Sequence, residues 1–429
     1  MNTSHKSMMT ILKDWKKFVV MKPKEKHRNF DVTIVGGGLV GMACALTLSK
    51  LGLTINLIEH TENSHNSHPS YDDRTLVVNQ ASIRFWQNLG IWENLLDDIT
   101  PIKQVHVSNK GHFGVVKFDA SDFEIDELAF IVEAKKLGMS LYQKVIDNQS
   151  INLICPAKFL EFNNLDDSIE IKYQFESEEF TDKSTLMIAA DGIQSGIRKT
   201  LNLPTEVKSY ERTAIICNIT PELKHNHCAY ERLTKEGPTA LLPFMNNRCG
   251  FVWSVKSSEA DEIMSLSDSE FLKRAQTQFG YRLGRFLKVG KRSCYPLYFV
   301  KVPQQTSNRV VLMGNAAHGV SPVSAQGLNL AVRDIANLVD VMELAIEKNN
   351  DIGSVQVLEK YQQSVDTDQT QTMQYTDDLM EWFKLDEPVI NKIRSLGLFS
   401  LQQSNVAKME LFKRASGYRG LTPKLLRQS

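Results

Sequence analysis

Residues 31–41 read DVTIVGGGLVG, a short apolar run that ends in three consecutive glycines. The apolar run predicts a buried β-strand, and the residues that follow recur with helical spacing. Gly36, Gly38 and Gly41 have the G-x-G-x-x-G spacing of a dinucleotide-binding turn. The first glycine permits the tight turn, the second lets the backbone approach a pyrophosphate, and the third lets the helix pack on the strand. We therefore expect a Rossmann-type βαβ unit here.

A second apolar run, from Thr54 to Ile58, ends at Glu59, 18 residues after Gly41. In a dinucleotide site, a carboxylate at this place accepts hydrogen bonds from ribose hydroxyls and disfavours the 2′-phosphate of NADP. The expected ligand is therefore FAD or NAD. The alternative is a glycine-rich turn that only packs, with Glu59 in solvent. The combination of strand, helix and acidic residue favours the dinucleotide site.

The composition excludes several classes of protein. The chain has 429 residues, 50 Lys+Arg, 50 Asp+Glu and 42% apolar residues, which is unlike a disulfide scaffold, a disordered tail or a nucleic-acid binder that relies on bulk positive charge. The zero net charge hides a split, because residues 1–29 carry eight basic and two acidic side chains. We therefore expect a basic N-terminal extension, residues 1–29, in front of an acidic body.

Within this extension, residues 11–20 place apolar side chains on one helical face and lysines elsewhere. Such a helix could lie on an anionic membrane surface. The alternative is a disordered leader with Met21 as the true start.

The six cysteines are scattered among apolar neighbours without a CxxC pair. This pattern predicts reduced, mostly buried thiols, no metal site and a cytoplasmic protein. No apolar run approaches the ~18 residues that span a bilayer, and the start lacks the features of a secretory signal.

Two further strands are expected to end in turns of small residues. The run 185–190 leads into AADGIQSGIR, and the run 309–313 leads into GNAAHGVSPVSAQG, which is followed by a helical pattern over 328–346. Between them, residues 209–300 contain antiparallel-type runs separated by Gly, Pro and Asn. From about residue 355 onward the pattern is helical and polar.

The glycine fingerprint, the AADG turn at 189–192 and the block GNAAHGVSPVSAQGLNLAVRD at 314–334 together resemble the single-component FAD-dependent aromatic hydroxylases with the p-hydroxybenzoate hydroxylase fold. Within that group the chain most resembles the ubiquinone-biosynthesis hydroxylases, nearest to those that act on 2-octaprenyl-6-methoxyphenol. Distinctive blocks such as SHPSYDDRTL at 67–76 and YERLTKEGPTALLPF at 230–244 carry this narrower resemblance.

The resemblance implies an α/β fold, with a Rossmann-type FAD-binding domain, an inserted antiparallel-sheet substrate domain and C-terminal helices. The expected segments are an extension at 1–29, the FAD-binding domain at 30–205 and 301–355, the substrate-domain sheet at 206–300 and a helical region at 356–429.

The same resemblance implies which residues contact FAD. Arg74 would reach the adenosine side. Asp191 would meet the pyrophosphate region and the path of the nicotinamide. The residues expected to bind the cofactor are Gly36, Gly38, Gly41, Glu59, Arg74, Asp191, Gly314, Asn315, Pro322, Gln326, Gly327 and Asn329.

Gly314 and Asn315 would lie beside the pyrophosphate and the ribityl chain, and Asn315 replaces the Asp that is commoner in the family. Pro322, Gln326, Gly327 and Asn329 would frame the isoalloxazine. The first three are also pocket candidates, and no side chain is assigned as catalytic because the flavin carries the chemistry.

The implied reaction is hydroxylation of a polyprenylated methoxyphenol ring in ubiquinone biosynthesis. NADPH or NADH would reduce FAD, and O2 would react through a C4a-hydroperoxyflavin. Partners would be the polyprenyl phenol, O2, a ubiquinone-biosynthesis complex and the inner-membrane surface. The alternatives are a flavin-dependent reductase of the same superfold and an FAD-binding scaffold subunit of a quinone-biosynthesis complex.

Some side chains have two interpretations. His318 invites a general-base role, although a structural hydrogen bond is favoured. His225 and His227 could hold a metal ion, although a solvated strand is favoured in the absence of a suitable third ligand. Phe244, Phe251 and Trp253 could equally line a substrate pocket or form core.

Overall fold

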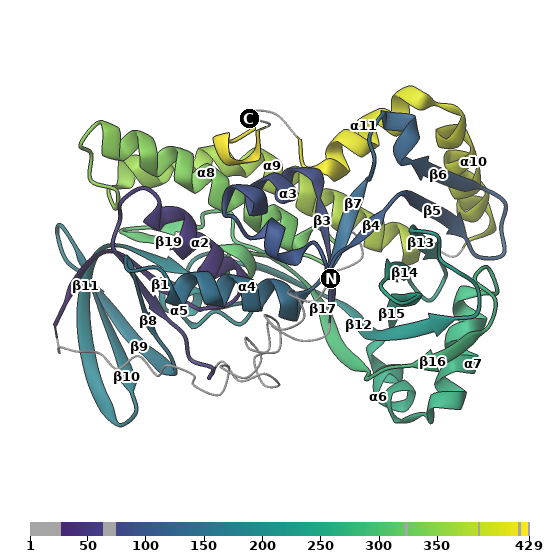
Figure 1. The fold of residues 1–429 in the computed structure, drawn as a ribbon, viewed down its shortest axis with the longest axis horizontal. Coiled ribbons are helices and arrows are strands. Elements are labelled where there is room, and N and C mark those ends of the chain that lie inside the picture. The colour runs from purple at the N-terminus through teal and green to yellow at the C-terminus, as the bar shows by residue number, and fades with distance from the viewer. Residues whose placement is uncertain (1–26, 63–73, 322–324, 385–386, 419–421, 428–429) are drawn as a thin grey trace, which may run out of the picture.

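A computed structural model describes residues 27–62, 74–321, 325–384, 387–418 and 422–427. Two large β-sheets lie side by side, and helices cover both (Figure 1). The expected amphipathic segment at 11–20 lies outside the described residues.

The first sheet contains the strands that the glycine motifs follow. Its central strands β19, β11, β1, β2 and β8 are parallel neighbours, so the carboxyl ends of β1, β11 and β19 meet at one edge. The strands run in the order β18 (Thr306–Ser307), β19 (Val310–Leu312), β11 (Glu178–Ala189), β1 (Asn29–Val35), β2 (Ile55–Ile58) and β8 (Ile151–Ile154), with β10 (Ile169–Phe175) and β9 (Ala157–Asn164) added antiparallel.

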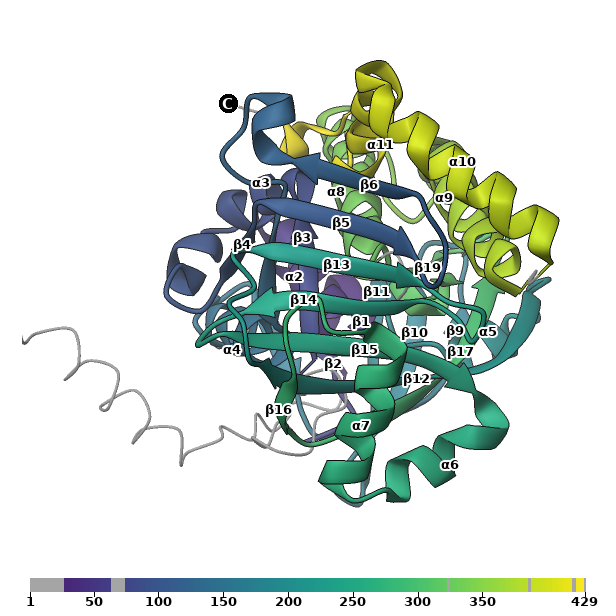
Figure 2. The same cartoon turned by 90° about the vertical axis from the view of Figure 1, so that its right-hand side faces the viewer.

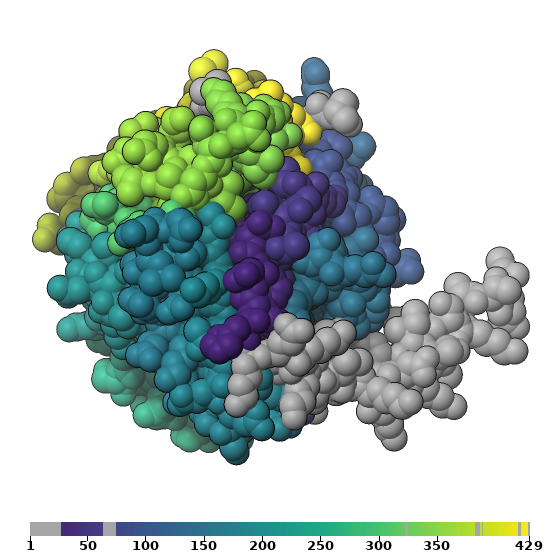
Figure 3. All heavy atoms as spheres, turned by 90° about the vertical axis from the view of Figure 1, so that its left-hand side faces the viewer, coloured from purple at the N-terminus to yellow at the C-terminus, as the bar shows by residue number. Residues whose placement is uncertain are grey.

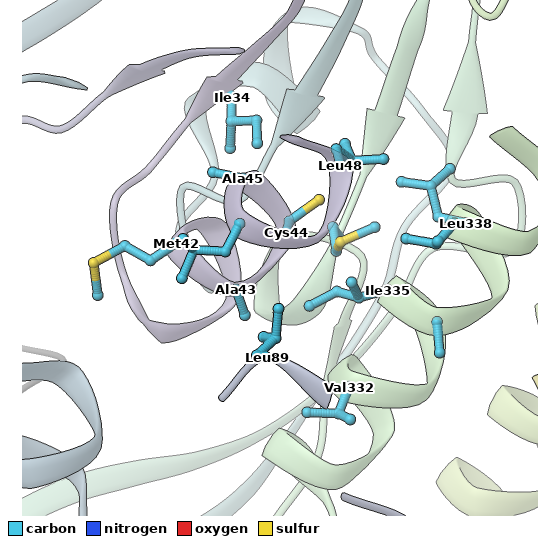
Figure 4. Packing of buried hydrophobic residues seen from close by; sticks show 14 of the residues in the cluster. Ile34, Met42, Ala43, Cys44, Ala45, Leu48, Leu89, Val332, Ile335 and Leu338 are labelled. Atoms are coloured by element: carbon cyan, nitrogen blue, oxygen red, sulfur yellow. The ribbon is translucent and has the colours of Figure 1, made fainter. Parts of the chain in front are cut away.

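Helices bury one face of this sheet. They are α2 (Leu39–Ser49), α3 (Gln80–Asn88), α4 (Ala134–Ile146) and α8 (Gly327–Glu347). The short α5 (Gly196–Thr200) follows β11, and its Ile197 packs in the cluster on the opposite face. Buried apolar side chains of α2, such as Cys44 and Leu48, share a cluster with Ile335 and Leu338 of α8 (Figure 4). Figure 3 shows the purple start of the described chain between the green helices and the blue and teal segments.

The second sheet is mostly antiparallel. Its strands run in the order β20 (His318–Gly319), β17 (Ser293–Lys301), β12 (Glu206–Pro221), β15 (Arg248–Lys256), β14 (Thr239–Phe244), β13 (Cys228–Leu233), β5 (Gln104–Asn109) and β6 (Val115–Asp119), and β16 (Phe286–Val289) pairs with β12. A small sheet of β3 (Thr75–Asn79), β7 (Ala129–Glu133) and β4 (Thr100–Ile102) lies near it.

Two strands of the second sheet, β5 and β6, come from outside the segment that the sequence predicted for this sheet. β5 and β6 lie far upstream of 206–300, and β5 pairs in parallel with β13. The expected boundaries at 205 and 300 therefore describe only part of this sheet and stay a proposal.

One face of the second sheet is covered by α6 (Ser257–Ser265) and α7 (Asp268–Phe279). Phe251 and Trp253 point into this layer and pack with Phe271 and Phe286 in a buried cluster. Phe244 is buried in a separate cluster. All three aromatic residues therefore belong to the hydrophobic core, and none of them lines the cavity described below.

The C-terminal region is helical, as expected, with α9 (Val355–Lys384), α10 (Pro388–Gln403) and α11 (Asn405–Ser416). Figure 2 shows α10 and α11 on the outside of the molecule, beside β5 and β6. Four short 3-10 segments complete the description: η1 (Trp92–Leu95), η2 (Ala120–Phe123), η3 (Gly314–Ala316) and η5 (Lys424–Leu426).

No helix among the described residues is both long and apolar enough to cross a bilayer. The six cysteines are unpaired, and Cys294 is the exposed one among them.

Arg28 belongs to the folded body, although it was expected in the N-terminal extension. Its guanidinium donates hydrogen bonds to the buried carboxylate of Asp182 at 2.9 and 3.3 Å. Tyr173 and Asn56 donate to the same carboxylate at 2.9 and 3.2 Å. This network joins the start of β1 to β2, β10 and β11.

Replacing Asp182 by Ala should lower the free energy of unfolding by roughly 3 kcal/mol, because Arg28, Tyr173 and Asn56 lose a buried charged acceptor. Urea unfolding of the flavin-loaded protein measures the change. Asp167→Ala, at an exposed turn, is the matched control. An effect of Asp182→Ala no larger than that of the control would contradict the stabilising role of the network.

Candidate functional site

Three turns of small residues meet at the carboxyl edge of the parallel strands. Gly36 has φ +108°, and a Cβ on it would lie 2.4 Å from the carbonyl oxygen of Ala190. A Cβ on Gly41 would lie 1.8 Å from the carbonyl oxygen of Gly36. Gly314 has φ +58° and faces Val40 of α2, with 3.1 Å from an added Cβ to Cγ1. The turns therefore form a cradle that only glycine backbones allow.

The amino end of α2 opens into this cradle. Gly38 is its N-cap residue, no side chain caps the helix, and its first turn contains no acidic residue. The first N–H groups of a helix have no intrahelical partner, and the helix dipole favours negative charge there. This end is therefore suited to a phosphate group.

Glu59 lies beside the same turn, at the end of β2. Its carboxylate accepts a hydrogen bond from the Gly37 N–H at 2.5 Å and another from the Thr61 N–H at 2.6 Å. A carboxylate oxygen can accept more than one hydrogen bond. Glu59 is therefore oriented by backbone groups and keeps the capacity to accept from ribose hydroxyls.

The AADG turn after β11 contains a buried oxygen atom without a partner. The Ile197 N–H donates to Asp191 Oδ2 at 3.3 Å, whereas Asp191 Oδ1 is buried and has no hydrogen bond among the described residues. Arg198 donates to the carbonyls of Ile193 at 2.7 Å and Ala316 at 2.9 Å, which ties this turn to the GNAA turn. Burial lowers the pKa of Arg198.

In the GNAA turn, Asn315 is exposed, and His318 is buried. His318 Nε2 donates to Asp334 Oδ2 at 2.5 Å, and Gln369 donates to the other oxygen of Asp334 at 2.9 Å. The favoured structural hydrogen bond of His318 is therefore present.

The amino end of α8 lies at the junction between the two sheets. Gln326 is its N-cap residue, the first turn holds no acidic residue, and the buried Oε1 of Gln326 has no partner among the described residues. Gly327 begins the helix. Pro322 lies outside the described residues.

Asn329 positions α8. Its amide donates to the carbonyls of Val77 at 2.9 Å and Ala325 at 2.8 Å, and its Oδ1 accepts from the Asn79 N–H at 3.1 Å. The side chain therefore holds the helix against β3. Arg74, which precedes β3, places its guanidinium 4.8 Å from the ring centroid of Tyr295 in β17.

These features fit a dinucleotide cofactor with a flavin. The glycine cradle accommodates a pyrophosphate, and Glu59 is oriented toward a ribose site. Asp191 Oδ1 in the AADG turn and Gln326 Oε1 at the amino end of α8 are buried acceptors that lack a donor among the described residues.

A cavity of about 630 Å3 lies beyond the amino end of α8. Its floor is the face of the second sheet opposite to α6 and α7, and α9, α10 and α11 form much of the remaining wall. The lining includes Val105, Val107, Val116, Phe118, Ala229, Leu233 and Leu242 from the sheet, Tyr375, Leu379, Leu398, Leu401, Leu411 and Phe412 from the helices, and Ala325, Gln326 and Asn329 at the end near the cradle.

Glu231 is an ionisable group in this apolar wall. It shares its strand face with Ala229 and Leu233, pairs with Val107 across to β5, and also lines a small adjoining pocket with Ala325. Desolvation raises its pKa to about 8. Its carboxyl group is therefore mainly protonated at neutral pH and titrates close to the pH at which a proton-transfer group works best.

The sequence pattern did not single out Glu231. One sequence feature could have indicated it: the residues at i−2 and i+2 of Glu231, which share its face of the sheet in a strand, are apolar. Without the fold, however, a solvent-facing Glu on an edge strand gives the same pattern.

The two histidines near β13 are not arranged for a metal ion. His225 is buried, donates from Nε2 to the Phe244 carbonyl at 2.9 Å and accepts at Nδ1 from the His227 N–H at 3.1 Å. Both ring nitrogens of His225 are used. The favoured solvated strand is also wrong, because these residues precede β13 in a turn. In the described ranges no group of three or more His, Cys, Asp or Glu could hold a metal ion.

Comparison with known proteins identifies the family to which the chain belongs. A sequence family described as an FAD binding domain matches residues 29–376, which is most of the chain. The expectation of an FAD site is therefore confirmed, whereas the individual contacts stay a proposal.

Two curated relatives match over nearly their whole length. The ubiquinone hydroxylase UbiL of Rhodospirillum rubrum is 27% identical, with 92% of this chain and 91% of the relative covered. The 3-demethoxyubiquinol 3-hydroxylase of Escherichia coli is 26% identical, with 90% and 98% covered.

A solved structure shows the same fold. The p-nitrophenol 4-monooxygenase PnpA of Pseudomonas putida aligns with a TM-score of 0.76 at 16% identity, covering 92% of this chain and 100% of that one. The expected α/β fold class is confirmed.

Gly41→Ala should abolish stable flavin binding, because its Cβ would meet the carbonyl oxygen of Gly36 at 1.8 Å and push α2 away from the cradle. Gly196→Ala, where an added Cβ meets nothing within 4 Å, is the matched control and should keep its flavin. The measurement is the visible flavin absorbance per mole of protein, with circular dichroism to verify the fold. Full flavin content in folded Gly41→Ala protein would contradict the cradle.

Proposed function

Because the chain belongs to the FAD-binding-domain family, we propose that it is an FAD-dependent monooxygenase that hydroxylates the ring of a polyprenylated phenol in ubiquinone biosynthesis. The observation that carries this proposal is the apolar cavity that adjoins the amino end of α8. The relatives named as ubiquinone and demethoxyubiquinol hydroxylases support it.

The cofactor contacts are proposed from the geometry of the cradle. Gly36, Gly38 and Gly41 would admit the pyrophosphate to the amino end of α2, and Glu59 would hold the adenosine ribose. Gly314 and Asn315 would lie beside the ribityl chain, and Arg74 would reach the adenosine side.

Buried acceptors without partners would face the rest of the cofactor. Asp191 Oδ1 would take a donor near the pyrophosphate, and Gln326 would lie at the isoalloxazine, with Gly327 and Asn329 holding the start of α8 in place. Pro322 stays an expectation from the resemblance.

The cavity suits a largely apolar substrate whose ring carries a few polar groups. Its volume lies within the roughly 300–1,000 Å3 of small-molecule sites. It would take the phenol ring and the first prenyl units, and a longer tail would emerge between the wall helices. A contact with the inner membrane follows from such a substrate, and membership of a ubiquinone-biosynthesis complex is kept as part of the proposal.

When bound, FAD supplies the redox chemistry, taking electrons from NADPH or NADH and using O2 to add one oxygen atom to the ring. The chain itself binds the ring, excludes water through its apolar wall and handles the proton of the ring hydroxyl. We assign this last role to Glu231, whose ionised carboxylate would accept the phenolic proton and make the ring more electron-rich.

Glu231→Gln should lower kcat/KM by roughly 10²-fold, because the amide cannot accept the phenolic proton. The pKa of Glu231 is raised, so its carboxylate is scarce below pH 8 and the rate of the unmodified enzyme should rise with pH up to about 8. The variant should lack this rise.

The measurement is kcat/KM against pH for a short-chain phenol, with Glu262→Gln on the exposed side of α6 as the control. An unchanged pH profile in flavin-loaded Glu231→Gln protein would contradict the assigned role.

Turnover in labelled O2 should place one labelled oxygen atom in the phenol ring, as measured by mass spectrometry, and labelled water should give none. Label that comes only from water would contradict the monooxygenase. Anaerobic turnover would favour the reductase alternative. A Gly38→Asp variant that loses FAD but keeps quinone synthesis in cells would favour the scaffold alternative.

A further inference from the structure

Helix α10 exposes apolar side chains on its outer face, and its inner face combines buried polar groups with the cavity-lining Leu398 and Leu401. Its buried side chains are Asn391, Arg394 and Ser395, which are at most 8% exposed. Val389 and Leu396 are 65% and 55% exposed. A surface helix of a globular protein normally places its apolar stripe toward the core.

Exposed apolar side chains lie on α10, on α11 and on the neighbouring β5–β6 hairpin, and we refer to them together as the α10 patch. Val389, Ile393 and Leu396 follow one another at helical spacing, and Phe399 lies beside them. The α10 patch comprises Phe113, Val389, Ile393, Leu396, Phe399, Val406 and Met409, all exposed. Grouped exposed apolar residues of this kind mark a binding surface more often than isolated ones.

Phe113 belongs to the patch although it comes from the β5–β6 hairpin. A Cβ on the adjacent Gly114 would lie 2.5 Å from the Ser395 carbonyl oxygen, so the hairpin touches α10 at this point. The Lys117 N–H also donates to Gln402 at 2.7 Å. The hairpin and α10 therefore lie side by side, as the ribbons of β5, β6 and α10 show (Figure 2).

The same helices separate the patch from the cavity. Ile393, Gly397, Leu398 and Leu401 of α10 line the cavity, as do Leu411 and Phe412 of α11. Ile393 is both exposed and part of the lining. Only one layer of helix therefore lies between the outer surface and the interior of the cavity.

The charge of these helices indicates which kind of surface fits the patch. The exposed charged residues within α10 and α11 are Lys392, Lys413 and Arg414 against Glu410, which pairs with Arg414. Arg394 and Lys408 are buried, and Lys408 pairs with Asp122. The chain after residue 29 is acidic overall, with 42 basic and 48 acidic side chains. Apolar side chains beside basic ones suit an anionic lipid surface, which attracts Lys and Arg and admits the apolar groups.

We propose that the α10 patch docks on an anionic lipid bilayer and that a prenylated substrate passes from the bilayer, between α10 and α11, into the cavity. The substrate part of this inference rests on the proposed function, whereas the docking part does not. In this position the apolar outer face of α10 is removed from water, and its inner face stays in the wall of the cavity.

The test compares the full chain, loaded with FAD, on phosphatidylcholine vesicles with and without phosphatidylglycerol. The unmodified protein should co-sediment with the anionic vesicles, and less so at high salt. The double variant Leu396→Glu/Phe399→Glu should partition at least tenfold more weakly. Neither residue lines the cavity. Leu287→Glu, at a similarly exposed apolar residue on β16, is the matched control and should bind as the unmodified protein does.

Turnover separates docking from catalysis. The double variant should lose at least tenfold in turnover of a long-chain prenyl phenol embedded in vesicles and keep its turnover of a short-chain soluble phenol. If the protein binds vesicles through the patch but hydroxylates neither phenol, the proposed function fails and the docking surface stands. Val406→Glu on α11 serves as a second variant if the double variant loses flavin.

Two results would overturn the docking surface. One is vesicle binding that is unchanged in both variants, which would place the lipid contact elsewhere on the chain. The other is a doubled mass in analytical ultracentrifugation that the variants reduce to one chain without any effect on vesicle binding, which would make the patch a contact between two copies.

Discussion

The contact between the backbones of three strand-end turns determines where the remaining parts of the molecule lie. α2 approaches the Gly36 carbonyl because Gly41 has no side chain, and Gly36 in turn lies against the Ala190 carbonyl. Gly314 closes the third side against Val40. The parallel register of β1, β11 and β19 brings these turns to one edge, so one geometric constraint produces both the core packing of α2 and an anion-binding helix end.

α8 transmits this constraint to the second sheet. Asn329 fixes its first turn to β3, and Arg333 forms an ion pair with Asp368 of α9 at 2.6 Å. Asp334 holds His318 at the end of the chain segment that joins the two sheets. Buried polar pairs of this kind add little net stability but are costly to break. Their effect here is to hold the helix in one position, with its amino end between the cradle and the cavity.

The sequence predicts the cradle well and the cavity poorly. The cradle depends on local patterns, since each glycine turn directly follows a short apolar run, and β1, β2, β11 and β19 all formed where these runs lie. The cavity depends on pairings between distant segments. The parallel pairing of β5 with β13 brings Val107 beside Glu231, and no local pattern indicates that strands more than 100 residues apart become neighbours. Phe251 and Trp253 were undecided for the same reason, because the side of the sheet that α6 and α7 cover is a tertiary property.

The inner face of α10 and the raised pKa of Glu231 both belong to the cavity that lies between them. A helix that faces an ordinary core buries its apolar stripe. The inner face of α10 instead combines the cavity-lining Leu398 and Leu401 with buried polar groups such as Arg394, so only some of the apolar side chains of the helix face inward. The other apolar side chains of α10, such as Leu396 and Phe399, are exposed. Their exposure to water is unfavourable, and contact with a lipid or a protein would remove this cost. On the opposite wall, desolvation in the apolar lining raises the pKa of the Glu231 carboxyl, so its neutral form is favoured. A substrate that brings a polar ring to Glu231 and an apolar tail to Leu398 and Leu401 would therefore occupy two ends of this one cavity, whereas the outer face of α10 needs a separate partner.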